Sequence, residues 1–303
     1  MFLDEPAVRS LLRMEELIPA LAEAMRDLSA GKVVQPLRQV LPVSEYDGFF
    51  GVMPAYGGAL GAKLVTFFPN NEEIPTHHAL IVLFRPETGE PLMTMDGRLI
   101  TEMRTAAVSA VATDLLARRE VNILAILGTG VQGRSHLEAL RLVRRFREIR
   151  VWSPRNAARF AKEHGVIAAS SAEQAVTGAD VVVVATSATT PLLKGEWLSA
   201  GVHINAVGAT RPNWRELDDD VLVKAKLFVE SREAASKESG DVIAAGQIFG
   251  ELGEVIAGTR AGRESDREMT LYKSVGVAVE DITAANLVYR KMQLSDASQE
   301  EAR

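Results

Sequence analysis

The sequence contains no cysteine, which excludes disulfides, thiolate nucleophiles and thiolate metal ligands together. Positive charge is not in excess either, because 34 Lys and Arg residues stand against 40 Asp and Glu residues, for a net charge of −6. This balance gives no support for nucleic acid or an anionic membrane as a partner. No stretch approaches the roughly 18 apolar residues that a membrane-spanning helix needs, and no secretory signal is apparent. We therefore expect a cytoplasmic protein without a membrane or nucleic-acid partner.

The spacing of apolar residues changes along the 303-residue chain, which is long enough for two domains. Residues 5–30 place apolar side chains at helical spacing, and Pro19 is expected to break this run into two helices. Between residues 33 and 100, short β-like runs alternate with Gly, Pro and Asn, and RPETGEP predicts a hairpin loop. Thr101 is expected to cap a helix that extends to about Ala117.

The rest of the chain alternates strand and helix patterns. Its short apolar runs are VNILAIL, IRVW, VVVVAT and VHINAVG, and the segments between them are mostly helical in pattern. This rhythm indicates a parallel sheet that helices cover on both faces. Near the end, YKSVGVAVEDITAANLVYRKM predicts an amphipathic helix that packs back on the first domain.

A G-x-G-x-x-G pattern lies between a seven-residue strand pattern and a helix pattern, as a dinucleotide-binding turn requires. It consists of Gly128, Thr129, Gly130, Val131, Gln132 and Gly133. Gly128 would permit the tight turn, Gly130 the approach of a pyrophosphate, and Gly133 close packing of helix against strand. The helix N-terminus would attract the phosphate charge. The alternative is a purely structural strand-to-helix turn, since 23 glycines make chance matches easy.

The acidic residue that often binds the adenosine ribose is missing. Ser153 lies 20 residues beyond Gly133, where that acid is expected, and Arg155 follows at the start of a predicted helix. A carboxylate there would repel a 2′-phosphate, whereas the serine hydroxyl and the arginine guanidinium can donate hydrogen bonds to one. A cation at a helix start also indicates a nearby anion. We therefore expect NADPH to be preferred over NADH; the alternative is a solvated arginine.

Segments from about residue 33 to residue 281 resemble the ornithine cyclodeaminase and mu-crystallin family. They include VVQPLRQVLPV, GFFGVMPAY, MDGRLITEMRTAAVSAVAT, GEWLSAGVHINAVGATRPNWRELDD, SREAASKESGDV and KSVGVAVED, and this set is far more specific than the glycine turn. The resemblance implies a homodimer with an N-terminal dimerisation and substrate domain and a Rossmann domain. Family members include ketimine reductases that use NADPH or, less well, NADH, a thyroid-hormone-binding protein, an alanine dehydrogenase, pyrroline-2-carboxylate reductases and ornithine cyclodeaminase.

Three cations are candidate substrate residues. Arg38 and Lys63 lie in β-like segments, where such side chains often face solvent. Arg104 interrupts a helix rich in Ala, Val and Thr, and its place near the predicted helix start indicates an anionic partner. By resemblance, Arg38 and Arg104 match the residues that hold the substrate carboxylate, for which the planar guanidinium is suited. Lys63 matches the lysine beside that carboxylate and the reacting nitrogen.

The resemblance also assigns further residues to the cofactor. The segments after two strand patterns, Thr186 with Ser187 and Val207 with Gly208, are expected to contact it. Thr76 and His77 are expected near the nicotinamide and the substrate. No metal site is expected, because the adjacent His77 and His78 would point to opposite faces of a strand. These two positions can equally be ordinary strand residues.

Thr210 departs from the pattern of ornithine cyclodeaminase, which carries a catalytic aspartate at the matching position. A hydroxyl of ordinary pKa cannot act as a general base at neutral pH, although it can orient water or substrate. The sequence therefore favours reduction over cyclodeamination. Asp218, Asp219 and Asp220 are read as a solvated helix start with favourable dipole placement.

We predict an α/β protein with a Rossmann-type dinucleotide-binding domain at 114–275. An α+β domain for dimerisation and substrate binding, at 1–113, is completed by a C-terminal helix at about 276–303. The predicted activity is NAD(P)H-dependent reduction of cyclic ketimine carboxylates, such as piperideine-2-carboxylate or pyrroline-2-carboxylate. The alternatives are an amino-acid dehydrogenase, an ornithine cyclodeaminase, and a non-enzymatic NADPH-gated protein that binds a small, hormone-like molecule.

Overall fold

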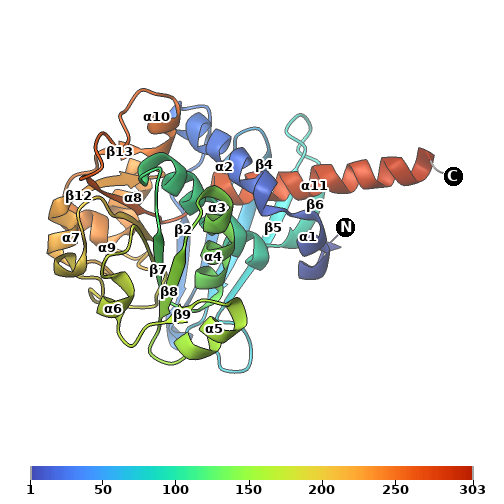
Figure 1. The fold of residues 1–303 in the computed structure, drawn as a ribbon. Coiled ribbons are helices and arrows are strands. Elements are labelled where there is room, and N and C mark those ends of the chain that lie inside the picture. Colours follow the sequence, from blue (N-terminus) through green and yellow to red (C-terminus); the bar gives the residue numbers. More distant parts are fainter. Residues whose placement is uncertain (1, 302–303) are drawn as a thin grey trace. The chain divides into compact units, whose positions relative to one another are not determined.

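The computed structural model describes residues 2–301, with side-chain detail for residues 2–294. The chain divides into two units, which we call the first unit (Met1–Arg104 with Val277–Arg303) and the second unit (Thr105–Gly276). The first boundary between the units lies between Arg104 and Thr105, within helix α3 (Arg98–Leu116; Figure 1), and not between residues 113 and 114 as expected. The second boundary lies between Gly276 and Val277.

The first unit is built on a six-stranded sheet with the order β1-β6-β5-β4-β3-β2. Strand β1 runs parallel to β6, and the remaining pairs are antiparallel. The predicted β-like runs correspond to β2 to β6, whereas β1 was not predicted, and RPETGEP joins β5 to β6 as expected. The strands are β1 (Phe2–Leu3), β2 (Gln39–Val43), β3 (Gly48–Tyr56), β4 (Leu60–Phe67), β5 (His77–Phe84) and β6 (Pro91–Asp96), with a short 3-10 helix η1 (Ser44–Tyr46) before β3.

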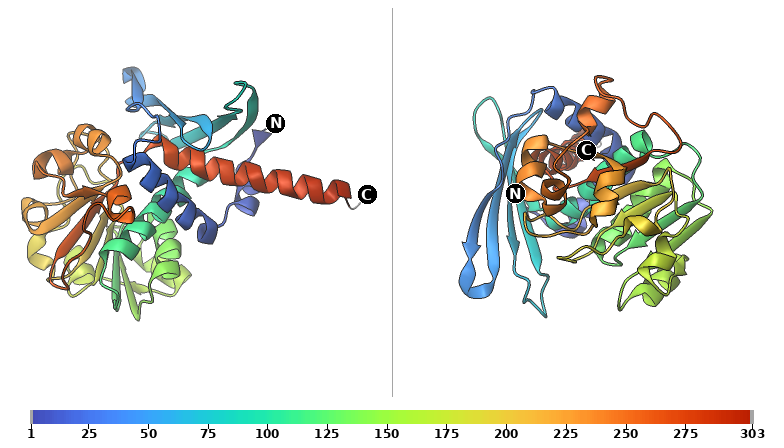
Figure 2. Two further views of the ribbon diagram at one scale, coloured as in Figure 1. Left: turned by 90° about the horizontal axis from the view of Figure 1, so that it is seen from above. Right: turned by 90° about the vertical axis from the view of Figure 1, so that its left-hand side faces the viewer.

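Helix α11 (Ala278–Glu301) contacts β3, β4 and β5, and Figure 2 shows it in red beside this sheet. Along β4, Gly61, Lys63 and Val65 are buried while their neighbours are half-exposed, as alternation on a strand requires. A Cβ placed on Gly61 would contact Ile282 of α11, so these three residues face the helix. Lys63 is thus a lysine on a buried, otherwise apolar face.

The prediction that Pro19 breaks the N-terminal helical run is wrong. Pro19 lies inside α2 (Met14–Ser29), and the break comes earlier, after α1 (Glu5–Leu11), where Leu12 is extended. Proline in a helix interior costs about 3 kcal/mol. Burial of each large apolar side chain returns about 1.5–3 kcal/mol, and Leu17, Leu21 and Met25 of α2 are all fully buried.

Helix α3 begins earlier than the sequence predicted. The Asp96 carboxylate accepts hydrogen bonds from the backbone N–H groups of Arg98 and Leu99, at 3.0 and 3.4 Å, and so caps the helix. Thr101 is already helical and its hydroxyl donates to the Gly97 carbonyl at 2.8 Å. The predicted Thr101 cap is therefore wrong, because aspartate two residues before the helix satisfies the same free N–H groups. Arg104 consequently lies beyond the first turn.

The second unit contains an eight-stranded sheet with the order β13-β12-β14-β11-β10-β7-β8-β9, in which every recorded pairing is parallel. This confirms the Rossmann-type α/β prediction. From β7 the chain first proceeds to β8 and β9 on one side and then returns to β10 and β11 on the other. The sheet therefore has its switch point between β7 and β10, where open α/β sheets bind ligands at the carboxyl ends of their strands.

Figure 1 shows α4 and α5 on one side of this sheet and α6 and α7 on the other. Its strands are β7 (Ile123–Leu127), β8 (Glu148–Trp152), β9 (Ile167–Ala168), β10 (Val181–Val184), β11 (His203–Ala206), β12 (Ala225–Val229), β13 (Gly250–Glu251) and β14 (Met269–Lys273). Its helices are α4 (Val131–Val143), α5 (Ala157–His164), α6 (Ala172–Val176), η2 (Gly195–Trp197), α7 (Asp219–Lys224), α8 (Arg232–Glu238), α9 (Gly240–Ala245) and α10 (Leu252–Ile256). Among the described residues, no helix is long and apolar enough to cross a membrane.

Candidate functional site

The glycine turn connects β7 to α4 in a conformation that only glycine fits well. Gly128 has φ +107°, and a Cβ there would collide with the carbonyl oxygen of Ala185. A Cβ on Gly133 would collide with the carbonyl oxygen of Gly128, so helix and strand pack as closely as the motif predicts. Both glycines are thus required by the backbone itself.

Gly130 differs from the other two glycines, because a Cβ there would meet no atom within 4 Å. Gly130 is the N-cap residue of α4, and it brings no side chain to the first N–H groups of the helix. Gln132 and the exposed Val131 lie in the first turn. Open space before an uncapped helix N-terminus fits a pyrophosphate, which these N–H groups and the helix dipole would hold.

A serine, Ser153, stands at the end of β8 where a ribose-binding acid is usual, and its hydroxyl meets that of Thr129 in the turn after β7. The Thr129 and Ser153 hydroxyl oxygens lie 2.7 Å apart, and the Ser153 hydroxyl accepts from the Asn156 backbone N–H at 3.2 Å. Arg155 is exposed in the turn before α5, so the expectation that it opens a helix is wrong, since α5 begins at Ala157. Residues 153–156 bring no negative charge to this end of the sheet.

Two loops follow the neighbouring strands β10 and β11, and they contain four of the predicted cofactor residues. Val184 and Ala206 are register partners, so the loops start side by side at the carboxyl edge of the sheet. Ser187 is exposed and Val207 is buried. Thr186 and Gly208 are half-exposed, and both bond to a side chain that the sequence did not single out, Glu216.

Glu216 is fully buried and its two carboxylate oxygens serve the two loops separately. Oε1 accepts from the Thr186 backbone N–H at 2.9 Å and from its hydroxyl at 2.6 Å. Oε2 accepts from the backbone N–H groups of Gly208 at 2.7 Å and Ala209 at 3.2 Å. Burial raises the pKa of Glu216, although the charge of Lys273 and these hydrogen bonds oppose the rise.

In the first unit, Lys63 and Arg104 meet two acids at the start of α11. Lys63 Nζ lies 2.7 Å from Asp281 Oδ2. Arg104 donates from Nε to Asp281 Oδ1 at 3.0 Å and from Nη1 to Glu280 Oε2 at 2.7 Å. All four side chains, which we call the Lys63 cluster, are at most 7% exposed. The anionic partner predicted for Arg104 is therefore present within the protein.

Burial and neighbouring charges shift the proton affinities in the Lys63 cluster. Burial lowers the pKa of Lys63 to about 8. The charges of Arg104 and Arg38 also lower it, whereas the charge of Asp281 raises it. Burial alone would raise the pKa of Asp281, but Arg104 and Lys63 hold it below its ordinary value. At neutral pH the lysine is therefore protonated and releases its proton more readily than an exposed lysine.

The remaining predicted residues divide between the two units. His77, at the start of β5, belongs to the surroundings of Lys63, because burial and then the charges of Lys63 and Arg104 lower its pKa to about 4. Thr76 precedes it and its carbonyl accepts from the Phe68 N–H at 2.8 Å. Arg38 lies just before β2 and is half-buried. Thr210 lies in the second unit, half-exposed after β11.

Asp281 and Glu280 were not identified from the sequence as residues of the site. Both acids follow the apolar run VGVAV at the start of the C-terminal helix, where solvated acids are common because of the helix dipole. In the structure both are fully buried. Only the packing of α11 in the fold reveals that Asp281 meets Lys63 and that both acids meet Arg104. Within the described residues, no group of three or more His, Cys, Asp or Glu side chains could hold a metal ion.

The chain matches the ornithine cyclodeaminase/mu-crystallin family model over residues 1–296. It belongs to the ornithine cyclodeaminase/mu-crystallin family. A ketimine reductase mu-crystallin from Mus musculus is 49% identical over 302 residues, covering 95% of this chain and 96% of that protein.

Two solved structures of high similarity extend the comparison across this family's fold. A pyrroline-2-carboxylate reductase from Thermococcus litoralis, in complex with NADH and L-proline, has a TM-score of 0.92 and 39% identity over 98% of each chain. An archaeal alanine dehydrogenase dimer with bound NAD has a TM-score of 0.92 and 35% identity, covering 98% of this chain and 97% of that chain. The family fold thus accounts for both units of this chain.

Proposed function

We propose that the protein is an NAD(P)H-dependent oxidoreductase that reduces cyclic ketimines with a carboxylate on the C=N carbon. The observation that carries this proposal is the Lys63 cluster, in which a protonated lysine of lowered pKa is buried beside Arg104 and two carboxylates. The fit of the glycine turn to a pyrophosphate supports a nicotinamide dinucleotide in the second unit. The similar mouse ketimine reductase and the relative with bound NADH and L-proline agree with both parts.

The reaction adds a hydride to the imine carbon and a proton to the nitrogen, so that C=N becomes CH–NH. When bound, the reduced nicotinamide supplies the hydride. The resemblance assigns the substrate carboxylate to Arg38 and Arg104, which would hold it through charge-assisted hydrogen bonds; Arg104 would do so in addition to its bonds to Asp281 and Glu280. Lys63 holds the proton that the nitrogen takes, and Asp281 keeps the lysine Nζ at a fixed position, 2.7 Å away. The amine of Lys63 then regains a proton from solvent before the next turnover.

Thr210 and the absence of an aspartate at its position support reduction rather than cyclodeamination. We expect pyrroline-2-carboxylate or piperideine-2-carboxylate to be consumed with NADPH, and no ammonia to be released from ornithine with NAD. Robust ammonia and proline formation from ornithine would overturn the proposal. A requirement for free ammonia with an open-chain 2-oxo acid would instead indicate an amino-acid dehydrogenase. If the protein binds NADPH but oxidises it with no imine, it would instead be a non-enzymatic protein that binds a small molecule.

Lys63 is tested directly by Lys63→Met, with Lys32→Met as the matched control on an exposed lysine. A positioned proton donor contributes about 10²- to 10⁴-fold to the rate. We expect this loss for Lys63→Met to be greatest from neutral pH to about pH 8, where the imine no longer brings its own proton but Lys63 still holds one. Cofactor oxidation is followed by absorbance. If Lys63→Met oxidised the cofactor at the wild-type rate at every pH, Lys63 would have no role in the mechanism.

A preference for NADPH over NADH belongs to the same proposal. It is supported by the hydroxyl pair of Thr129, after β7, and Ser153, after β8, and by the exposed Arg155 beyond Ser153. A 2′-phosphate needs hydroxyl or cationic neighbours, whereas a carboxylate there would repel it. Steady-state constants for both cofactors measure this preference.

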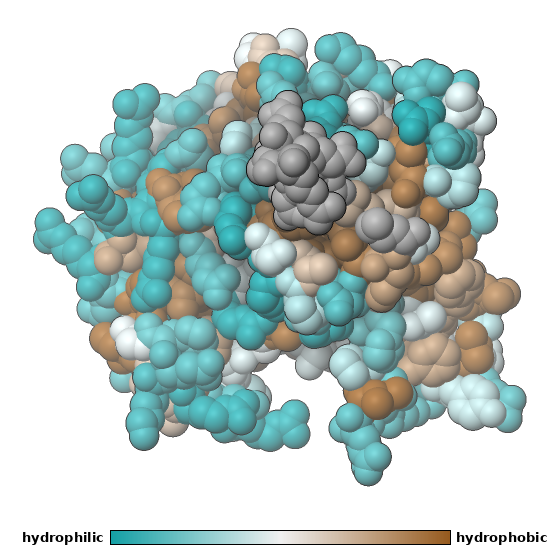
Figure 3. All heavy atoms as spheres, turned by 90° about the vertical axis from the view of Figure 1, so that its right-hand side faces the viewer, coloured by the Kyte–Doolittle hydropathy of each residue, from teal (hydrophilic) through white to brown (hydrophobic). Residues whose placement is uncertain are grey.

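We also propose a homodimer formed through the first unit. The face of its sheet that points away from α11 carries cross-strand rows of half-exposed apolar side chains, and Figure 3 shows hydrophobic surface, in brown, on one face of the molecule. Apolar rows of this kind are typical of homodimer interfaces. The similar archaeal alanine dehydrogenase is a dimer. The rows consist of Val52, Leu64 and Leu80, and of Pro54, Ala62 and Val82.

A further inference from the structure

The first residues of the loops after β10 and β11 are joined by one carboxylate, that of Glu216. Farther along, the two loops also bond through their backbones, where the Leu192 and Leu193 N–H groups each donate to the Glu216 carbonyl at 2.9 Å. Each oxygen of Glu216 accepts two hydrogen bonds from one loop, from Thr186 on one side and from Gly208 and Ala209 on the other. A buried carboxylate is costly unless its oxygens are satisfied, and four donors satisfy this one. The positions of both loops therefore depend on the same side chain.

The close approach of the two loops requires this arrangement. A Cβ on Gly208 would collide with the Thr186 carbonyl oxygen and with the Glu216 carboxylate. Gly208 is thus packed directly against the acid and the neighbouring loop. A small shift of the Glu216 carboxylate would have to move both loops at once.

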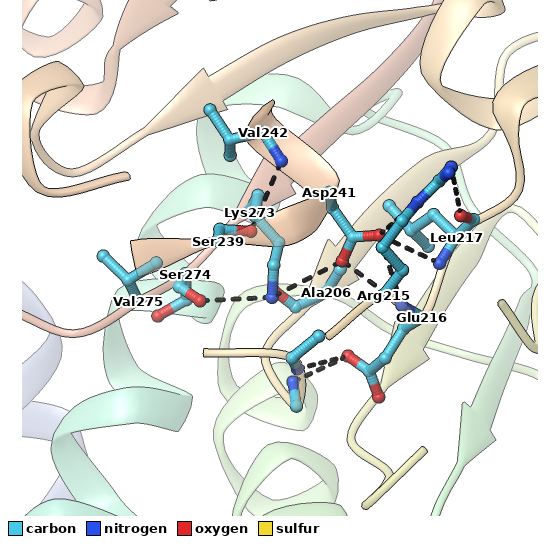
Figure 4. A network of polar contacts seen from close by, with 12 residues as sticks. Ala206, Arg215, Glu216, Leu217, Ser239, Asp241, Val242, Lys273, Ser274 and Val275 are labelled. Atoms are coloured by element: carbon cyan, nitrogen blue, oxygen red, sulfur yellow. Dashed lines mark hydrogen bonds and ion pairs between the residues drawn. The ribbon is translucent and has the colours of Figure 1, made fainter. Parts of the chain in front are cut away.

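The backbone of Glu216 is bonded to Asp241, which in turn lies beside Lys273, as Figure 4 shows. The Glu216 and Leu217 backbone N–H groups donate to the Asp241 carboxylate, each at 3.2 Å. Lys273 Nζ lies 4.0 Å from Asp241 Oδ2 and donates to the Ala206 carbonyl, at the end of β11, at 3.3 Å. The chain of contacts runs from β14 through Asp241 to Glu216, all in the buried part of the second unit.

We infer that Glu216 is a positioning residue that sets the two loops for the nicotinamide half of the cofactor. The inference rests on the proposed function. The phosphate turn follows β7, and β10 and β11 are the next two strands along the sheet. A dinucleotide whose pyrophosphate lies at the turn and whose adenosine lies toward β8 extends its other half over the ends of β10 and β11. Glu216 is not a catalytic residue, because it acts through Thr186, Gly208 and Ala209.

The test is Glu216→Gln, with Glu196→Gln as the matched control on an exposed acid of the same unit. The amide replaces one acceptor oxygen by an NH₂ group that faces N–H donors, so one loop loses its bonds. We expect NADH to bind about 10- to 100-fold more weakly and kcat to fall. ADP-ribose, which lacks only the nicotinamide, should bind as it does to the wild-type protein. Binding is measured by calorimetry.

The ratio of the two affinities separates positioning from general damage. A purely structural role would weaken NADH and ADP-ribose equally or leave both unchanged, and either result overturns the inference. If Glu216→Gln does not fold, Thr186→Val removes the 2.6 Å hydroxyl bond to Glu216, together with the bond that the same hydroxyl accepts from the Ala188 N–H at 3.1 Å, and should change the same ratio in the same direction. A wild-type protein that binds neither NADH nor NADPH would overturn the proposed function as well, whereas normal wild-type binding with an unchanged ratio overturns only the role of Glu216.

Discussion

Asp281→Asn removes the negative charge that lies 2.7 Å from Lys63 Nζ and leaves the positive charges of Arg104 and Arg38 in place. Asp281 is the neighbour that raises the pKa of Lys63, against burial and the two arginines. Without it the pKa of Lys63 must fall below its present value of about 8. The lysine then loses its proton at a lower pH, and the proton donor is absent over more of the alkaline range.

The size of the shift follows from the energy of the contact. A hydrogen bond to a charged group contributes about 1.5–3 kcal/mol, and one pKa unit corresponds to about 1.4 kcal/mol. The alkaline limb of kcat/KM for imine reduction should therefore move down by about one to two pH units. The ionisation of the imine is common to both proteins and cancels in the comparison.

The assay is the pH profile of cofactor oxidation with a cyclic ketimine, for the wild-type protein, Asp281→Asn and Asp27→Asn. Asp27 is partly exposed and pairs only with surface cations, so its variant should keep the wild-type profile. An Asp281→Asn profile that falls in amplitude at every pH but keeps its alkaline limb would refute the reasoning. In that case Asp281 would serve packing rather than the proton affinity of Lys63.

Other predictions concern the cofactor, acid stability and assembly. Arg155→Ala should raise the Michaelis constant for NADPH about tenfold or more and leave that for NADH nearly unchanged; an equal effect on both would place Arg155 away from the 2′-phosphate. Burial lowers the pKa of His136 to about 4 and of His203 to about 3, both below the ordinary 6.5. As the pH falls below about 6.5, the unfolded state takes up protons before the folded state, so each histidine should cost about 2 kcal/mol of unfolding free energy by pH 5. Urea unfolding at pH 7 and pH 5 measures this loss, and equal stability would contradict it. Leu64→Glu should convert a dimer to a monomer in light scattering, whereas Leu142→Glu, on the exposed surface of the second unit, should not; a monomeric wild-type protein would remove the dimer proposal.

The sequence predicted β2 to β6 of the first sheet and β7, β8, β10 and β11 of the second, because apolar runs and turn residues are local signals. It missed β1, β9, β12, β13 and β14, and it assigned Tyr272 and Lys273 of β14 to the C-terminal helix, which begins only at Ala278. It also predicted the glycine turn, since φ +107° at Gly128 and the collisions at Gly133 are written into the residue types. Local signals failed where two of them competed. Asp96 and Thr101 can both cap a helix. In the structure the Asp96 carboxylate accepts from the first N–H group of the helix, whereas the Thr101 hydroxyl donates to the Gly97 carbonyl inside it.

The acids of the site could not be predicted, because their role depends on contacts between distant parts of the chain. Asp281 follows an apolar run in the same way as many solvated helix starts, and Lys63 is 218 positions before it in the sequence. Glu216 is one of several acids in WRELDDD, and only its four hydrogen bonds distinguish it from the exposed Asp219 and Asp220. Burial of a charge is a property of the fold, and no residue type announces it.

The division of the chain has a consequence for biosynthesis. The second unit is one continuous segment, Thr105–Gly276, whereas the first unit is completed only by α11. Domains generally fold as units during translation, so a ribosome releases all of the dinucleotide-binding unit before it adds the helix that carries Glu280 and Asp281. Until then, Lys63 and Arg104 have none of the carboxylates that neutralise them in the finished protein. A nonsense mutation at codons 277–280 would therefore leave the second unit whole and deprive Lys63 and Arg104 of both carboxylates.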